Sequence, residues 1–115
     1  MRNLTIAVIA IVALCSCTTT KSLYSWYDYE DATYQYNKKR TEELKAKVLE
    51  QYKKLTENQK KGSRGVVPPG LYAEYGYMLY MSGKKDEGLG FLKQEIKSYP
   101  ESETYISRII KQLEK

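Results

Sequence analysis

Hydrophobic residues recur at three- and four-residue intervals in five successive stretches after residue 24, which is the spacing of amphipathic α-helices. The first predicted helix runs from about Ser25 to Lys38 and the second from Thr41 to about Lys60. Thr41 is a candidate N-cap, because its side chain can accept a hydrogen bond from the first helical turn. The apolar stripe of the first helix consists of Trp26, Tyr29, Thr33 and Tyr36.

Proline and glycine mark the ends of three further helices. Pro68-Pro69 opens the third helix and Gly83 stops it in a left-handed conformation. This helix is apolar nearly all round, so we expect other helices to cover it on more than one side. The fourth helix runs from Lys85 or Asp86 to Ser98 and ends at Pro100. The fifth starts near Glu101 or Ser102 and carries the stripe Ile106, Ile109, Ile110 and Leu113.

The first residues predict a targeting segment. Arg2 precedes an apolar run from Leu4 to Leu14. This run is shorter than a transmembrane helix normally is and has the length typical of a signal-peptide core. The sequence Leu14-Cys15-Ser16-Cys17 resembles the bacterial lipobox, with Cys17 as the lipidated residue. We therefore expect a signal peptide over 1–16, a lipidated Cys17 and tether over 17–24, and one helical domain over 25–115. The resemblance implies a lipid-anchored protein of the outer membrane that faces the periplasm.

Composition excludes several kinds of site. The chain has 115 residues with 19 Lys+Arg, 14 Asp+Glu and no histidine, so its formal net charge is +5. Without histidine there is no Ser-His-Asp or Cys-His site and no H-E-x-x-H metal motif. No phosphate-binding loop or nucleic-acid-binding motif is present either. We expect no metal, no cofactor and no nucleic acid.

One stretch of the predicted third and fourth helices resembles the tetratricopeptide repeat. The matching positions are Tyr72, Tyr75, Gly76, Leu79, Gly83, Gly88, Leu92 and Pro100. In such a repeat Gly76 and Gly88 let two antiparallel helices approach closely. Glu95 departs from the pattern, since the repeat prefers a small residue there. The expected fold is all-α with about five helices, in tetratricopeptide-like antiparallel pairs with a C-terminal capping helix.

A longer resemblance covers nearly all of the chain after residue 17. The run Pro68-Pro69-Gly70-Leu71-Tyr72-Ala73-Glu74-Tyr75-Gly76, together with the early Tyr24, Trp26 and Tyr29, resembles a bacterial lipoprotein family named domain of unknown function 4810. The resemblance implies a small outer-membrane lipoprotein. It also implies an envelope complex with a lipoprotein similar to the curli secretion channel and a second small lipoprotein, and no known reaction.

Two sets of residues are candidates for function. Glu74 and Glu95 are charges on otherwise apolar helices, and they serve either acid–base chemistry or, as we expect, the structure alone. In the structural interpretation Glu74 lies on an exposed strip and Glu95 bonds to a tyrosine or lysine. Both glutamates are also candidates for partner binding. Trp26, Tyr27, Tyr29 and Tyr34 belong to an aromatic cluster that lines a binding surface or packs into the core. If Trp26 proves buried, the concave face of the third to fifth helices is the next place to look.

We therefore expect a non-catalytic, lipid-anchored adaptor that binds protein partners in the envelope. Interface hot spots favour Trp, Tyr and Arg, so the aromatic cluster supplies its candidate contacts. The alternative is a peptidoglycan- or glycan-binding module that uses the same Tyr and Trp side chains.

Overall fold

The structure is a computed structural model that describes residue 3 and residues 20–115. The predicted signal peptide and Cys17 lie outside the described residues. Within the part described, the chain is all-helical and without strands, as the sequence predicted. It contains the five α-helices α2 (Tyr29–Lys39), α3 (Glu42–Glu57), α4 (Leu71–Met81), α5 (Lys85–Ser98) and α6 (Glu103–Leu113), with a 3-10 turn η1 (Pro100–Ser102) before the last.

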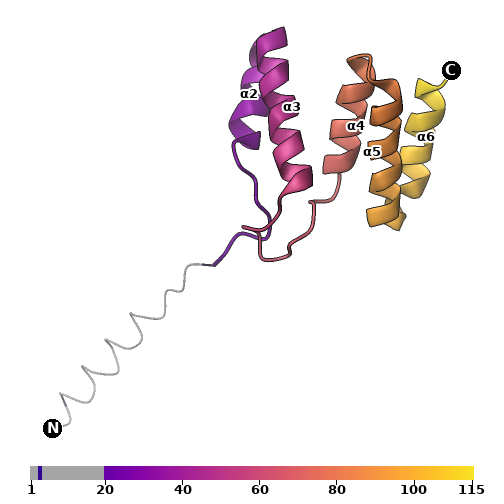
Figure 1. The fold of residues 1–115 in the computed structure, drawn as a ribbon. Coiled ribbons are helices and arrows are strands. Elements are labelled where there is room, and N and C mark those ends of the chain that lie inside the picture. The colour runs from indigo at the N-terminus through magenta and orange to yellow at the C-terminus, as the bar shows by residue number, and fades with distance from the viewer. Residues whose placement is uncertain (1–2, 4–19) are drawn as a thin grey trace.

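The helices pack on one another in the order of the chain. Figure 1 shows α2 and α3 as one antiparallel pair, joined by a linker to α4, α5 and α6, which stand side by side. Packing contacts join α2 to α3, α3 to α4, α4 to α5 and α5 to α6. The linker, residues 58–70, lies at the same end of the domain as the segment that precedes α2 (Figure 1).

Buried side chains from the first three helices and the linker form the main core. Val48 and Leu55 of α3 are completely buried. They pack with Ala32, Tyr52, Val67, Leu71, Tyr75 and Leu79. The apolar face of α3 lies against this core, as helical periodicity requires. From the stripe predicted for the first helix, Tyr29 and Tyr36 pack against the core, whereas Trp26 lies before α2 and is exposed.

Helices α4 and α5 cross at two glycines. A Cβ placed on Gly76 would lie 2.5 Å from the carbonyl oxygen of Gly88, and one placed on Gly88 would lie 2.5 Å from the carbonyl oxygen of Gly76. Real Cβ atoms do not approach backbone atoms this closely, so only glycine fits on either side. The close approach predicted from these two glycines is confirmed.

The predicted helix ends are mostly right. Thr41 accepts a hydrogen bond from the Leu44 N–H (3.2 Å), as an N-cap does. Gly83 has φ +96° directly after α4, the left-handed conformation expected there. Helix α4, however, begins at Leu71 rather than at the prolines, because Gly70 (φ +91°) is its N-cap. Helix α3 ends at Glu57 rather than near Lys60, because the next residue is extended.

The predicted start of the first helix at Ser25 is wrong, since α2 begins at Tyr29. Side-chain amides of Gln59, in the linker, and Gln51, in α3, bind the backbone of the preceding segment instead. The Ser25 N–H donates to Gln59 Oε1 (2.8 Å), and the Gln59 side-chain amide donates back to the Ser25 carbonyl (3.0 Å). Two residues further on, Tyr27 has a positive φ of +48°, which interrupts a helix. The Asp28 N–H donates to Gln51 Oε1 on α3 (3.1 Å).

A short backbone pairing joins the same segment to the linker. The Ser63 N–H donates to the Ser22 carbonyl (2.9 Å), and the Arg64 N–H donates to the Leu23 carbonyl (3.1 Å). Gly62 is needed for this approach, because a Cβ there would lie 2.6 Å from the Leu23 carbonyl oxygen. Residues 22–25 are therefore part of the folded domain and lie against the linker at one end of it (Figure 1).

Candidate functional site

A groove of about 920 Å³ runs over α4, the end of α5 and α6. Its volume lies in the upper part of the range of about 300–1,000 Å³ that is usual for ligand sites. Three of its side chains are large, apolar in their bulk and exposed to solvent. Tyr77 and Met81 of α4 are 48% and 61% exposed, and Tyr105 of α6 is 69% exposed. The remaining lining residues are Pro69, Gly70, Ala73, Glu74, Glu95, Tyr99, Glu101, Ser102, Ile106, Ile109, Gln112 and Leu113.

The expectation that other helices cover α4 on more than one side is confirmed, since both α3 and α5 pack on it, but one face of α4 remains open. Leu71, Tyr75 and Leu79 are buried against the core, as the pattern predicted. Tyr77 and Met81 lie on the opposite face and remain open. Helix α6 packs mainly on α5 and touches α4 at its end, where the Tyr80 hydroxyl donates to the Leu113 carbonyl (2.7 Å). The rest of the face between α4 and α6 stays hollow.

Glu95 is a buried acid beside this groove. The residue is only 1% exposed, and its Oε1 accepts a hydrogen bond from the Ala73 N–H (3.3 Å) in the first turn of α4. We expected a tyrosine or lysine partner, and the structure supplies a backbone N–H instead. Because Gly70 offers no capping side chain, the carboxylate of α5 takes over that task. The departure from the repeat pattern at this position thus has a structural reason.

The electrostatic surroundings of Glu95 disfavour its charge. Burial raises the pKa of this carboxyl above its ordinary value, and the nearby charges of Glu101 and Glu74 raise the pKa further. The backbone N–H groups at the start of α4 act in the opposite direction and offset only part of this. Its second oxygen, Oε2, is buried and has no hydrogen-bond partner.

Glu74 lines the groove from α4 and also reaches the aromatic residues behind it. Its Oε2 accepts hydrogen bonds from the hydroxyls of Tyr29 (2.7 Å) and Tyr52 (3.1 Å). Burial and the charge of this carboxylate raise the pKa of both tyrosines, so both hydroxyls stay protonated. The two glutamates predicted as a pair therefore line one groove, but each is already engaged in holding helices together. This arrangement supports the structural interpretation of both residues.

Two residues of the predicted aromatic cluster, Trp26 and Tyr29, belong to a row of rings that runs through the domain. Trp26 packs on Tyr24 and Tyr29, with ring centroids 5.8 and 5.6 Å apart. The row continues through Tyr52 and Tyr75 to Phe91 and Tyr72. Its outer end remains open, because Trp26 is 40% exposed.

The other aromatic candidates lie at different depths. Tyr27 is exposed, and its hydroxyl donates to the Asn58 carbonyl (2.8 Å). Tyr34 is exposed on α2, with the Lys38 ammonium 5.8 Å from its ring centroid. Tyr29 is half-buried and bonded to Glu74. Trp26, Tyr27 and Tyr34 are therefore free to contact a ligand, and Tyr29 belongs mainly to the packing.

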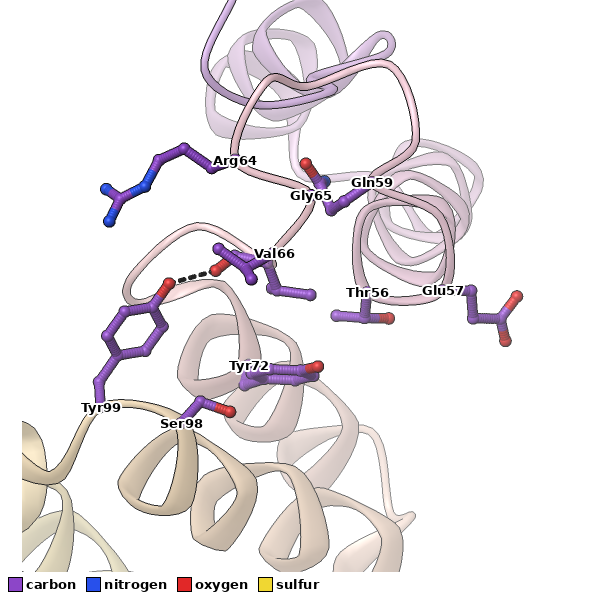
Figure 2. Close-up of a pocket in the computed structure, with 10 residues that line it drawn as sticks. Thr56, Glu57, Gln59, Arg64, Gly65, Val66, Tyr72, Ser98 and Tyr99 are labelled. Atoms are coloured by element: carbon purple, nitrogen blue, oxygen red, sulfur yellow. Dashed lines mark hydrogen bonds between the residues drawn. The ribbon is translucent and has the colours of Figure 1, made fainter.

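A second hollow, of about 520 Å³, lies between α3, the linker and the end of α5. Figure 2 shows Tyr99 directed toward the linker, where its hydroxyl donates to the Val67 carbonyl (dashed line). Arg64 points away from Thr56 in the same view and donates to the Tyr24 hydroxyl (2.9 Å). These two bonds hold the linker from both sides. The hollow therefore results from the way the linker joins the two groups of helices.

Sequence reasoning missed the exposed groove residues Tyr77, Met81 and Tyr105, and the acid Glu101. The third predicted helix carried a signal of the open face. It is apolar nearly all round, and its neighbouring helices cannot cover all of its sides. The apolar stripe of α6 gave a second signal, because it has four members, Ile106, Ile109, Ile110 and Leu113. Only Ile106 of that helix is buried. Neither pattern identifies which apolar face stays open, because that depends on where α6 packs.

The described part of the chain lacks two kinds of feature. Residues 20–115 hold no group of three or more His, Cys, Asp or Glu side chains arranged to bind a metal ion. Among the same residues, none of the helices has the length and apolar character needed to cross a bilayer.

The fold and groove define a small helical domain with one open, partly apolar concave face. The chain belongs to the family described as Domain of unknown function (DUF4810), whose model matches residues 23–109. That range contains all of α2 to α5 and most of α6. No curated protein and no solved structure matches the chain.

Proposed function

We propose that this protein is a non-catalytic adaptor that binds a segment of a partner protein in the groove between α4 and α6. The supporting observation is the exposure of Tyr77, Met81 and Tyr105 around one hollow of about 920 Å³. Tyrosine and methionine are enriched at protein interfaces, where they contribute large contact areas. Solvated apolar residues gathered in a concavity are typical of such a binding site.

The proposal includes a lipid anchor and a place in the envelope. The lipobox-like sequence that ends at Cys17 favours acylation there, and two or more long acyl chains hold a protein on a membrane stably. The adaptor would then lie at the outer membrane and face the periplasm. Its partners would be other envelope lipoproteins, including one similar to the curli secretion channel, as the family resemblance implies.

The repeat-like arrangement of α4 to α6 supports the same function. In tetratricopeptide-like folds, antiparallel helix pairs present a concave surface to peptides or helices. Here α4 and α5 would form the repeat and α6 the capping helix, with the groove on the concave side. The glycine crossing of α4 and α5 is consistent with this interpretation.

A second candidate function rests on the open end of the aromatic row. Trp26, Tyr27 and Tyr34 are exposed within a short stretch of chain, and aromatic faces of this kind also bind sugar rings. A peptidoglycan- or glycan-binding module is therefore the alternative. It predicts that Trp26, and not the groove, determines binding.

One experiment separates the two functions. The full chain is expressed in its own envelope, extracted in mild detergent with its lipid intact, and captured together with bound proteins. An adaptor should retain a partner in stoichiometric amount, lose it when Tyr105 becomes Ala, and keep it when Trp26 becomes Ala. Retention on purified cell-wall sacculi that depends on Trp26 and not on Tyr105 would support the glycan-binding alternative and refute the adaptor.

A further inference from the structure

The charge of the groove is opposite to the charge of the chain. Three acids, Glu74, Glu95 and Glu101, line it, and no lysine or arginine does. The whole chain carries a formal net charge of +5, so the negative charge of the groove is opposite in sign to that of the chain as a whole. A groove lined by one sign of charge attracts ligands of the other sign.

Glu95 adds an observation that is independent of this charge count. Its Oε2 is buried and has no hydrogen-bond partner, while its Oε1 is held by the Ala73 N–H. A buried polar atom without a partner costs free energy, and the cost is greater for a charged group. Because Glu95 lines the groove, this oxygen lies just beneath the groove surface, and a small turn of the side chain would present it to a donor in the groove.

The described part of the chain does not supply such a donor. The ion pairs found there are Lys47 with Glu43 and Lys54 with Glu50, both on α3 and away from the groove. A Lys or Arg side chain from a ligand would satisfy the free oxygen, since hydrogen bonds between ionised groups are the strongest of their kind. Glu101, exposed on η1, would face the same cation.

The walls of the groove restrict what can carry that cation. Tyr77 and Met81 from α4 and Tyr105 and Ile109 from α6 are apolar over most of their area. A free metal ion or a small polyamine would leave these side chains in water. A polypeptide with apolar residues on both sides of one cationic side chain would cover them.

We infer that the groove recognises a segment of a partner protein in which one Lys or Arg, flanked by apolar residues, reaches Glu95 and Glu101. This inference rests on the proposed function of the groove and names the chemistry of its ligand. The aliphatic stem of Lys or Arg packs along apolar walls while its charged end reaches the acids. Glu95 is thus both the cap of α4 and the residue that selects the ligand.

The test uses the full chain in detergent micelles and a display library of random twelve-residue peptides. Peptides that bind are synthesised in matched pairs, in which each Arg is replaced by citrulline, its neutral isostere. We expect the bound peptides to carry one cation between apolar residues, and the Arg form to bind at least tenfold more tightly than the citrulline form. Glu95→Gln should bring the two affinities within about twofold, because it keeps the size and the Oε1 acceptor but removes the charge.

Two further variants control for folding and for general charge. Glu101→Gln alters an exposed residue that holds no helix, so it should reduce the preference for Arg without lowering the melting temperature. Glu103→Gln removes a charge of the same kind from α6 outside the groove and should leave the preference unchanged. An equal loss of preference in Glu103→Gln would show that only the overall charge matters and would overturn the inference.

The outcomes distinguish this inference from the proposed function. If peptides bind in a way that depends on Tyr105 but prefer no cation, the groove is a peptide site and the inference is wrong. If the groove is instead occupied by a second copy of the chain, a dimer that dissociates on Tyr105→Ala will appear in sedimentation, and the inference is also wrong. If no peptide binds in a way that depends on Tyr105, both the inference and the proposed function fail.

Discussion

Two glycines on the same helix give a matched test of the packing. Gly88 and Gly90 both lie in α5, and alanine at either position would raise helix propensity by about 1 kcal/mol. Their surroundings differ completely. A Cβ on Gly88 would lie 2.5 Å from the Gly76 carbonyl oxygen and 2.7 Å from the Tyr80 nitrogen, whereas a Cβ on Gly90 would meet nothing within 4 Å.

The expected effects therefore have opposite signs. Ordinary contacts of a Cβ begin near 3.4 Å, so Gly88→Ala must move backbone atoms of α4 and α5 apart by almost 1 Å. Overpacking of this kind costs typically about 1–3 kcal/mol, and here it acts on backbone, which cannot rotate away. After the gain in propensity of about 1 kcal/mol, we expect a net loss of up to about 2 kcal/mol for Gly88→Ala. Gly90→Ala should gain about 0.5–1 kcal/mol.

Thermal and urea unfolding of the full chain in detergent, followed by circular dichroism at the helical band, measures both changes. For a domain of this size, 1 kcal/mol moves the melting temperature by roughly 4–8 °C. The melting temperature should fall for Gly88→Ala and rise for Gly90→Ala. A stabilised Gly88→Ala variant, or the same shift in both, would show that the two helices do not meet at these glycines. Gly76→Leu places a larger side chain at the same crossing and should cost more than Gly88→Ala.

Three further predictions concern other parts of the chain. Cys17→Ser should release the protein into the soluble envelope fraction or leave its precursor unprocessed, and normal processing with membrane retention would contradict the lipid anchor. Trp26, the one tryptophan, should be quenched by acrylamide in the isolated protein because it is 40% exposed, and a blue-shifted, protected emission would exclude it from the binding surface. Burial raises the pKa of Glu95 in the folded state, so its charge reduces stability at neutral pH and this cost disappears as the pH falls below the ordinary value of 4.5. Glu95→Gln should therefore melt higher than the parent at pH 7, with a difference that shrinks toward pH 4; a lower melting temperature at pH 7 would refute this.

Much of the fold followed from local patterns. Thr41, Gly83 and Pro100 end or begin helices by rules that involve only their neighbours in sequence, and these predictions are right. Gly76 and Gly88 lie further apart, but their positions in a repeat-like pattern indicated the crossing. The family was also accessible from sequence, since the run from Pro68 to Gly76 is distinctive and the family model matches the chain.

What failed depends on distant partners. The segment from Ser25 to Asp28 has a helical pattern, yet Gln59 of the linker and Gln51 of α3 bind its backbone, and no local rule reveals a bond across 34 residues. The groove escaped prediction for a similar reason. Tyr75 and Tyr77 are the same residue type, two positions apart on one helix, so the sequence does not tell them apart. Only the packing of α6 on α5 decides which of them is left exposed to solvent.

The pairing of Ser22 and Leu23 with the linker has a mechanical consequence. Force applied to the beginning of the chain would load hydrogen bonds to residues 59–64, at the junction between the two groups of helices, before it reaches α2. If Cys17 carries the lipid, only residues 18–21 separate it from this junction, a span of at most about 14 Å at 3.3–3.6 Å per residue. The membrane would hold the domain close to its surface by the end that carries the linker (Figure 1), so the groove could meet only partners that themselves come close to the bilayer.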